Sequence, residues 1–461
     1  MMIRARRLPT PSLPLLLLII LFATLWLGGG ASRADALGQA LVRSMAWALL
    51  GATILFGPRP RLGEARPVLL LLVAAVLLSL LQLVPLPPPL WQTLPGRGVL
   101  TEAAASSGQA QPWRPLAIVP GAAANAVASL VVPIATYVLI VSLRPEERRW
   151  LPRLMPALVV AGALVGLLQF SGVHFNNPLI NDTVGEVSGP FANRNHFALF
   201  VAMGCTMVPT WAFLDGRSPH WRAPVALGLS VLLALIILSS GSRAGLALGA
   251  VGLVCGLLIA RKDIRRLLAR YPRWVFPSLV AAIVGLIAIF VLISVAADRA
   301  VAINRALAMD PAQDMRSRGL PIVWDMVATY FPAGSGLGGF DQLFRLHEPF
   351  ALLKPTYFNH AHNDWLEIVL DAGAAGALLL GAAVAWWGWA SVRAWRGQTS
   401  GSVMQGRLGS TLIGMILLAS LFDYPARTPM VMAILVVAAR WMCGEPEAAS
   451  TSALPRDGRH L

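Results

Sequence analysis

The chain has 461 residues, of which 56% are hydrophobic and only 13% are charged. A soluble domain of ordinary composition carries about 25% charged residues, so this composition excludes a soluble enzyme and predicts a polytopic membrane protein. The formal net charge is +15, and Lys262 and Lys354 are the only lysines among the basic residues. Arginine suits phosphate recognition through its planar fork. Genomic base composition produces the same bias, so the positions of the arginines must decide between these two explanations.

Apolar segments of about twenty residues, long enough to cross a bilayer, follow one another along most of the chain. The twelve predicted spans cover residues 13–29, 36–56, 68–86, 121–143, 154–170, 196–214, 223–239, 246–260, 275–296, 365–389, 409–422 and 428–442. The first span follows a basic stretch, as in a signal peptide, but no small-residue cleavage site and soluble domain follow it. We therefore expect an uncleaved first span and an all-α integral membrane fold of about twelve transmembrane helices.

The positions of the basic residues predict the topology. They gather at the N-terminus and in every even-numbered connection between spans, whereas the short connections on the other side hold far fewer, and residues 176–193 hold none. Cytoplasmic loops carry the excess of lysine and arginine in membrane proteins. Both termini are therefore expected in the cytoplasm.

Two connections on the outer side are long. Residues 87–120 are rich in Pro, Gly and Ser and predict an irregular flap, and residues 297–364 form one large loop between the ninth and tenth spans. The expected organisation is N-terminal spans with the flap (1–120), central spans (121–296), the large loop (297–364), C-terminal spans (365–443) and a disordered cytoplasmic tail (444–461).

The start of the tenth span carries the strongest functional signal. His360 and His362 precede the helix, and Asp364, Glu367 and Asp371 recur along it on one face. Acids favour a helix N-terminus, which accounts for Asp364 and Glu367, but Asp371 lies two turns deep in apolar sequence. Ionisable groups inside a membrane helix are costly, so this cluster predicts a functional site.

The two histidines also have the spacing of a metal-binding motif. Zinc takes three or four protein ligands at close spacing, and neither His347 nor Asp364 completes such a pattern around His360 and His362. The three cysteines lie far apart in apolar spans and give no ligand spacing or disulfide framework. We expect no metal.

Four of the arginines on the outer side, where the positive-inside rule disfavours cations, are candidates for phosphate binding. Arg243 lies in a turn of small residues, and Arg194 lies in a Gly-Pro turn where Asn195 is expected to cap the following helix. Arg316 and Arg318 lie in the large loop. Phosphate binding explains these positions, but so do snorkelling, capping or a solvated basic face.

Three smaller features predict local structure in the C-terminal half. The apolar residues after the paired arginines recur at helical spacing and predict an amphipathic interfacial helix anchored by Trp324 and Tyr330. The run at 334–339 fits GxGxxG, but no strand–helix unit surrounds it, so we interpret it as a glycine-rich turn that re-enters toward the site. Asp423 and Arg427 are expected to form an ion pair.

Several of these residues resemble the signature of bacterial O-antigen ligases. His362 and Asn363, followed after nine residues by Gly373 and after two more by Gly376, match the pattern H[NSQ]-x9-Gxx[GTY]. Three further stretches resemble the same family, at residues 189–195, 240–243 and 334–340. The resemblance to the O-antigen ligase and Wzy-type polymerase superfamily covers roughly residues 178–429.

This resemblance implies a GT-C-like helical fold and an inverting glycosyl transfer in the periplasm, without metal or cofactor. The donor would be a glycan on undecaprenyl diphosphate and the acceptor a sugar hydroxyl. His362 is the expected base, because imidazole titrates near neutral pH. Glu367 would orient it or act instead, and binding of the diphosphate is the alternative role for His362.

The resemblance also implies roles for the other polar residues. Departure of a diphosphate requires cations where negative charge develops, and the topology offers Arg194, Arg243, Arg316 and Arg318. The residues expected to support the site are His360, Asn363, Asp364 and Asp371.

Members of the superfamily differ in their acceptor. A ligase uses the lipid A core and a Wzy-type polymerase extends a lipid-linked chain, while protein O-oligosaccharyltransferases share the same motifs. The full signature favours a ligase. A secondary transporter is the alternative from another class, although no two related halves are found. The expected partners are the lipid-linked donor, a lipid or glycan acceptor and the bilayer of the bacterial inner membrane, and not nucleic acid.

Overall fold

The computed structural model describes residues 10–173, 177–181, 183, 185–214, 219–296, 315–353, 358–397 and 400–444. The basic N-terminal stretch, the first part of the large loop (297–314) and the expected tail beyond Gly444 lie outside the described residues.

The described residues form an all-α fold, as predicted, with a single two-stranded sheet. In this part of the chain nine helical segments are long and apolar enough to cross a membrane: α2 (Leu37–Phe56), η1 (Leu62–Ala65) with α3 (Arg66–Leu81), α6 (Pro120–Ser129) with α7 (Val131–Ser142), η2 (Arg148–Trp150) with α8 (Leu151–Phe170), α9 (Arg194–Phe213), α10 (Arg222–Ser239), α11 (Arg243–Leu268), α16 (Asp364–Arg396) and α17 (Gly401–Ala419). Shorter apolar helices are α1 (Leu13–Gly28), the Val275–Leu286 part of α12 (Val275–Ala296) and α18 (Pro429–Met442). Each predicted span coincides with one of these helices, while the number of membrane crossings stays a prediction.

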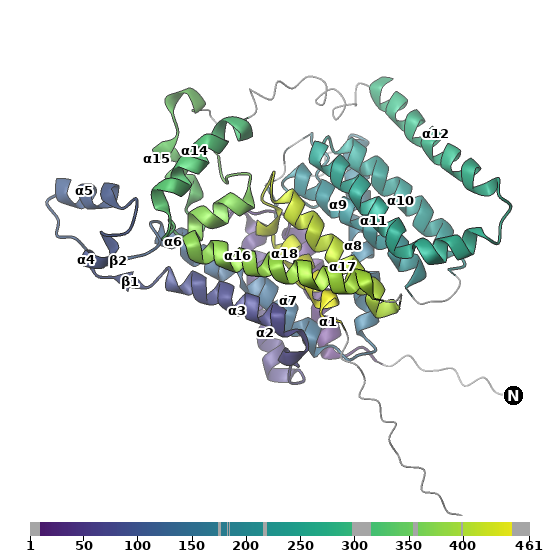
Figure 1. The fold of residues 1–461 in the computed structure, drawn as a ribbon, viewed down its shortest axis with the longest axis horizontal. Helices are drawn as coiled ribbons and strands as arrows, with labels where there is room; N and C mark the ends of the chain where they lie inside the picture. The colour runs from purple at the N-terminus through teal and green to yellow at the C-terminus, as the bar shows by residue number, and fades with distance from the viewer. Residues whose placement is uncertain are drawn as a thin grey trace, which may run out of the picture.

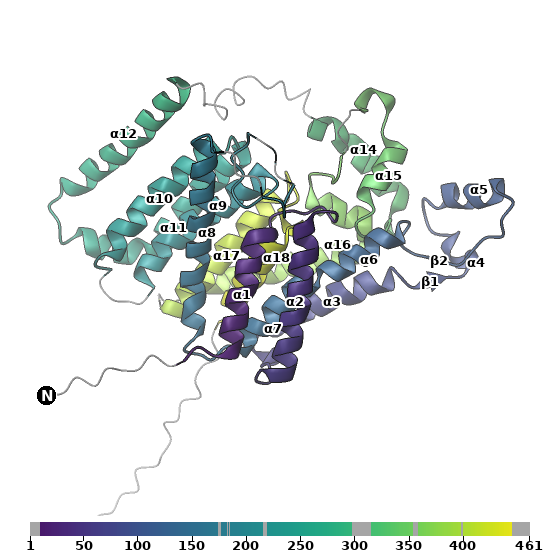
Figure 2. The same cartoon turned by 180° about the vertical axis from the view of Figure 1, so that it is seen from behind.

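The helices pack in two groups (Figure 1). One group surrounds α9, whose side chains are almost all buried against α8, α10, α11 and α17. In the other group α1, α2, α7 and α18 pack together (Figure 2), and α3 lies against α16. The contact between α17 and α18 joins the two groups. The helix α12 and the flap with α5 lie at opposite edges of the molecule.

Small residues allow α9 and α11 to approach closely. A Cβ atom on Gly252 would lie 2.4 Å from the carbonyl oxygen of Ala202, and one on Gly256 would lie 2.8 Å from that of Cys205. Helix pairs in membranes associate through such close packing of small residues. The α9–α11 contact therefore forms the core of its group.

The flap at residues 87–120 is ordered, which differs from the irregular segment expected. It contains the short helices α4 (Pro88–Trp91) and α5 (Gly98–Ser106), and the antiparallel pair β1 (Pro85–Leu86) and β2 (Arg114–Pro115) closes its base. Arg97 is buried and donates hydrogen bonds to the carbonyl oxygens of Leu116, at 2.7 Å, and Gly334, at 2.9 Å. Burial lowers the pKa of Arg97 to about 10. The paired backbone groups and this arginine hold the flap against the large loop.

The described part of the large loop forms the helices α14 (Met315–Tyr330) and α15 (Phe340–His347) and the short turn η4 (Phe350–Leu352). The amphipathic helix is present, but its buried face carries Val323, Met326 and Tyr330. Tyr330 is therefore not an exposed anchor, because its hydroxyl lies 3.1 Å from Nε2 of His347, whereas Trp324 is exposed.

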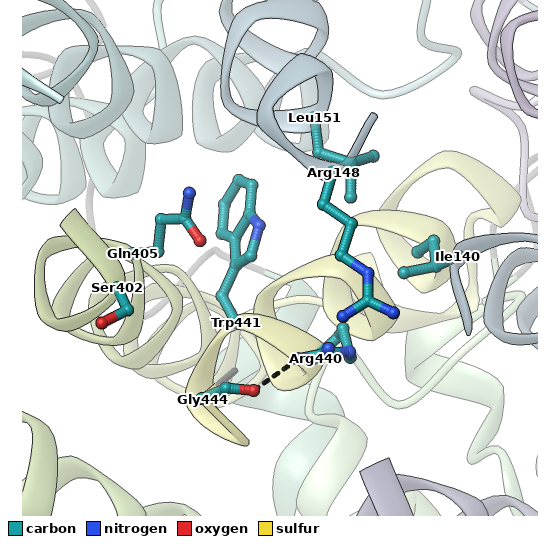
Figure 3. Close-up of a pocket in the computed structure, with 8 residues that line it drawn as sticks. All are labelled: Ile140, Arg148, Leu151, Ser402, Gln405, Arg440, Trp441 and Gly444. Carbon is teal, nitrogen blue, oxygen red and sulfur yellow. Dashed lines mark hydrogen bonds between the residues drawn. The ribbon is translucent and has the colours of Figure 1, made fainter. Parts of the chain in front are cut away.

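Ion pairs tie the helices together at the end of the bundle opposite the histidines. Glu64 of η1 accepts from Arg148, at 2.5 Å, and from Arg440 of α18, at 3.4 Å. Figure 3 shows the small pocket beside these two arginines, where Arg440 also donates to the carbonyl oxygen of Gly444. Three segments that are distant in the sequence are joined here by one carboxylate.

Candidate active site

Helix α16 begins directly after the two histidines. The side chain of Asn363 caps it by accepting a hydrogen bond from the backbone N–H of Leu366 at 3.1 Å. His362 precedes the cap with a φ of +51°, a conformation that residues other than glycine rarely adopt. Backbone strain of this kind concentrates at functional sites.

Arg427 joins the three acids of α16. This arginine belongs to η5 (Pro425–Arg427), and its guanidinium nitrogens lie 2.9 Å from Asp364, 3.1 Å from Glu367 and 3.7 Å from Asp371. Burial alone would lower the pKa of Arg427, but the three carboxylates raise it. The prediction that the acids share one face is confirmed. The predicted pair of Arg427 with Asp423 is wrong, because the acids of α16 surround the guanidinium.

Glu367 positions His360, not His362. One of its carboxylate oxygens lies 2.8 Å from Nδ1 of His360, and the other accepts from the backbone N–H of Ala361 at 2.8 Å. Glu367 is completely buried. The expectation that Glu367 orients His362 is therefore wrong, because the chain turns between the two histidines.

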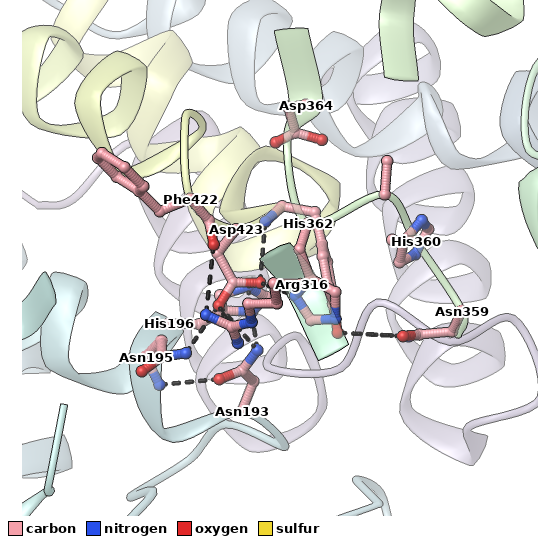
Figure 4. A network of polar contacts seen from close by, with 12 residues as sticks. Asn193, Asn195, His196, Arg316, Asn359, His360, His362, Asp364, Phe422 and Asp423 are labelled. Atoms are coloured by element: carbon pink, nitrogen blue, oxygen red, sulfur yellow. Dashed lines mark hydrogen bonds and ion pairs between the residues drawn. The ribbon is translucent and has the colours of Figure 1, made fainter. Parts of the chain in front are cut away.

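Asp423 is the partner of His362 (Figure 4). Its carboxylate lies 3.2 Å from Nδ1 of His362, 3.6 Å from Nε2 of His196 and 3.4 Å from a guanidinium nitrogen of Arg316. Asn195 adds a hydrogen bond of 2.8 Å. Sequence reasoning missed this role of Asp423, although an acid directly before the last span could have been recognised as a candidate for the site.

The environment of Asp423 keeps its carboxylate ionised. Burial alone would raise its pKa, but the hydrogen bonds and charges of His196 and His362 hold the pKa well below the ordinary value. An ionised carboxylate beside an imidazole fixes the tautomer and orientation of the ring. The arrangement therefore points the Nδ1–H of His362 at Asp423 and leaves Nε2 for another partner.

Tyr424 connects the two histidine sites. The centres of three imidazole rings surround its ring, at 4.3 Å for His360, 4.9 Å for His362 and 5.0 Å for His196. Its hydroxyl lies 3.3 Å from the side-chain nitrogen of Asn359. Burial, followed by the charge of the neighbouring carboxylate, raises the pKa of Tyr424 to about 12. Tyr424 therefore stays a neutral spacer between the imidazoles at neutral pH.

Of the four predicted diphosphate-binding arginines, Arg316 contacts the histidine cluster. Arg318, on the same helix, donates to the carbonyl oxygen of Ala351 at 3.3 Å. Arg194 pairs with Glu186 at 2.6 Å. Arg243 is the exposed first residue of α11.

The cap before the sixth predicted span differs from the expectation. Asn193, and not Asn195, caps α9, and it accepts from the backbone N–H of Asn195 at 2.8 Å. The side chain of Asn195 is thereby left for Asp423. The amide predicted to be structural is thus part of the histidine site.

The glycine-rich run forms the turn that the sequence indicated. Gly334, Gly336 and Gly338 all have positive φ, and the backbone N–H of Gly338 donates to the carboxylate of Asp371 at 3.2 Å. The turn packs where α16 is broken at Gly373, which has φ +57° and ψ −144°. The carboxylate of Asp371 is thereby buried between the turn and Arg427.

A cavity of about 720 Å³ opens beside His360 and runs between α3, α6, α16 and α18. Its polar lining includes Arg33, Arg43, His360 and Arg427, whereas most of the remaining lining is apolar and rich in leucine and alanine. A second, almost entirely apolar cavity of about 280 Å³ shares part of the same wall. The lining is that of a site for a molecule with a polar head and a long apolar portion.

The two histidines turn to different carboxylates, and no group of three or more His, Cys, Asp or Glu side chains within the described ranges is arranged to hold a metal ion. The polar groups of the site are instead arginines, amides and imidazole–carboxylate pairs.

Fold and site together define a multi-pass helical membrane protein with a buried histidine–carboxylate site at one end of its bundle. Residues 228–381 match the family model described as O-Antigen ligase, which supports the resemblance to the O-antigen ligase and Wzy-type superfamily. The match begins in α10 and ends in α16, so it contains His362 but not Asp423. It supports a glycosyltransferase of the ligase or polymerase type. No curated protein matches the chain.

Proposed function

We propose that this protein is an O-antigen ligase-like glycosyltransferase of the bacterial inner membrane. It transfers a glycan from undecaprenyl diphosphate to a sugar hydroxyl of the lipid A core at the periplasmic face, with inversion and without a metal. The observation that carries this proposal is that His362, which lies inside the segment matching the ligase family, is held by the ionised Asp423.

His362 acts as the general base. Its Nδ1 faces Asp423 at 3.2 Å, which leaves Nε2 to accept the proton of the acceptor hydroxyl. The hydroxyl oxygen then forms a bond to the anomeric carbon while the bond from that carbon to the diphosphate oxygen breaks. The proton remains on His362 and the electron pair leaves with the diphosphate.

Arginines stabilise the departing diphosphate. Arg316 lies beside Asp423 and remains 38% exposed, so it can also reach a ligand. Arg318 lies on the same helix, and Arg243 and Arg194 are the further expected ligands. Charge-assisted hydrogen bonds from arginine to phosphate are strong and need no metal. Arg194 is already paired with Glu186, so we assign it the smallest contribution.

Three alternative functions remain: two would use the same donor chemistry, and the third is transport. A Wzy-type polymerase or a protein O-oligosaccharyltransferase would use the same donor chemistry with another acceptor, and the complete signature from His362 to Gly376 favours the ligase. A secondary transporter binds its substrate near the bilayer midplane. Here the imidazoles of His196, His360 and His362 lie at or just before the first residues of α9 and α16 instead.

The test is a transfer assay with the purified protein in detergent, undecaprenyl-diphosphate glycan and excess chelator. We expect transfer to the lipid A core, with a loss of about 100-fold or more in His362→Ala because the base is removed. His220→Ala, an exposed histidine outside the cluster, is the matched control. Extension of the lipid-linked chain would identify a polymerase, and full activity of His362→Ala would overturn the mechanism.

A further inference from the structure

Arg43 is an arginine inside a membrane-length helix. It lies on α2, six residues after Leu37, which places it about 9 Å along the helix from its start. An arginine within the apolar part of a membrane is costly, and such residues face a cavity or a partner. Arg43 lines the 720 Å³ cavity.

The charge of Arg43 has no acidic partner among the described residues. One guanidinium nitrogen donates to the side-chain oxygen of Asn125 on α6 at 2.5 Å, and the buried Nε has no hydrogen-bond partner there. The other cations of this cavity differ, because Arg33 pairs with Asp35 and Arg427 pairs with the acids of α16. Arg43 is partly buried, and a cation withdrawn from water without a counter-charge is costly, so its position predicts an anionic ligand.

The rest of the cavity indicates the class of that ligand. Leu71, Leu72, Leu379 and Leu380 line its apolar part, and the 280 Å³ cavity continues past Leu435. His360 also lines this cavity. A molecule that fills this space has an anionic group near Arg43 and long apolar chains along α3 and α16. A snorkelling arginine would instead extend to water, whereas Arg43 is fixed to α6.

We propose that Arg43 and Asn125 bind the phosphate group of a lipid whose chains occupy this cavity. The proposal rests on the proposed function for the choice between two such lipids, the polyprenyl diphosphate donor and the phosphorylated lipid A acceptor. Both residues lie outside the matched segment 228–381, so the N-terminal part of the chain would contribute a substrate-binding wall to the active site. Arg43 and Asn125 are binding residues here and take no part in proton transfer.

The experiment measures binding without turnover. Purified His362→Ala protein, which cannot complete transfer under the proposed mechanism, is titrated with decaprenyl diphosphate, with lipid A, and with undecaprenol, which lacks phosphate. We expect Arg43→Gln in this background to weaken binding of one phosphorylated lipid by about 10-fold or more, as for loss of a charge-assisted contact, and to leave undecaprenol unchanged. The lipid that is affected identifies the source of the phosphate.

Two further variants keep the result interpretable. Arg43→Lys keeps the charge and should restore part of the affinity, and Arg33→Gln removes a cation of the same cavity that is already paired with Asp35. Equal affinity of Arg43→Gln and the parent for all probes, or no binding of either phosphorylated lipid by the parent, would overturn the proposal. Full transfer activity of His362→Ala would instead contradict the proposed function, and the binding result would stand separately.

Discussion

At the scale of single residues, the site depends on which carboxylate faces which imidazole. Glu367 faces His360 and Asp423 faces His362. The pKa of Asp423 lies well below its ordinary value despite burial. A carboxyl group whose pKa is lowered in the folded state stabilises the fold at any pH above its unfolded-state pKa. This stabilisation is lost as the pH falls through the lowered, folded-state pKa. Asp423 is therefore ionised throughout the neutral range in which a histidine base works.

Replacing Asp423 by Asn should slow transfer about 100-fold through kcat, with little change in KM. The amide keeps the shape of the side chain but removes the charge that fixes and stabilises the protonated imidazole of His362. Steady-state transfer kinetics across pH 5–8 would measure this. Asp325→Asn, at an exposed position of α14, is the matched control. Unchanged kcat in Asp423→Asn would show that His362 works without this partner.

At the scale of an element, α16 functions because it is not a continuous helix. Its first turns carry the acids that surround Arg427, and its remaining turns line the apolar cavity. The break at Gly373 lies against Pro332 and admits the glycine-rich turn. A regular helix would leave no space for that turn, whose amide holds Asp371.

Gly373→Ala should lower the free energy of unfolding by at least about 2 kcal/mol, since it combines overpacking with a left-handed backbone. A Cβ atom there would lie 2.0 Å from the carbonyl oxygen of Pro332. Gly381→Ala is the control on the same helix, because a Cβ atom there meets nothing within 4 Å. Thermal unfolding in detergent, followed by tryptophan fluorescence, compares the two. Equal unfolding temperatures of Gly373→Ala and Gly381→Ala would mean that the fold does not require the break in α16.

At the scale of the whole molecule, polar contacts at both ends of the bundle join distant parts of the chain. At the histidine end Asp423 joins α9, α14 and the loop before α16. At the opposite end Glu64 joins the N-terminal helices to η2 and α18. The two ends share helices but no side chain, so stability and catalysis can be perturbed separately.

Glu64→Gln should lower the free energy of unfolding by about 3 kcal/mol, because it leaves Arg148 and Arg440 buried without their counter-charge. Transfer activity well below the unfolding temperature should be unchanged. Glu146→Gln, at an exposed position nearby, controls for the loss of one charge. A drop in kcat without a drop in stability would instead link this end of the molecule to the reaction.

Much of this protein can be predicted from local patterns. Apolar segments of membrane length predict the helices, because a backbone in lipid must satisfy its own hydrogen bonds. The spacing of Asp364, Glu367 and Asp371 predicts a shared face, and the H[NSQ]-x9-Gxx[GTY] pattern indicates the family that the match at residues 228–381 shows. These inferences succeed because helix period and motif spacing are properties of neighbouring residues.

The pairing of charges was decided by the tertiary structure. Asp423 lies four residues before Arg427 in the sequence, yet Asp423 faces two histidines whereas Arg427 faces the acids of α16. Likewise, no local pattern places Arg43 in one cavity with His360, because α2 and the loop before α16 meet only when the helices pack. Long-range electrostatic partners depend on where whole helices lie relative to one another, and the spacing of residues along one helix does not contain that information.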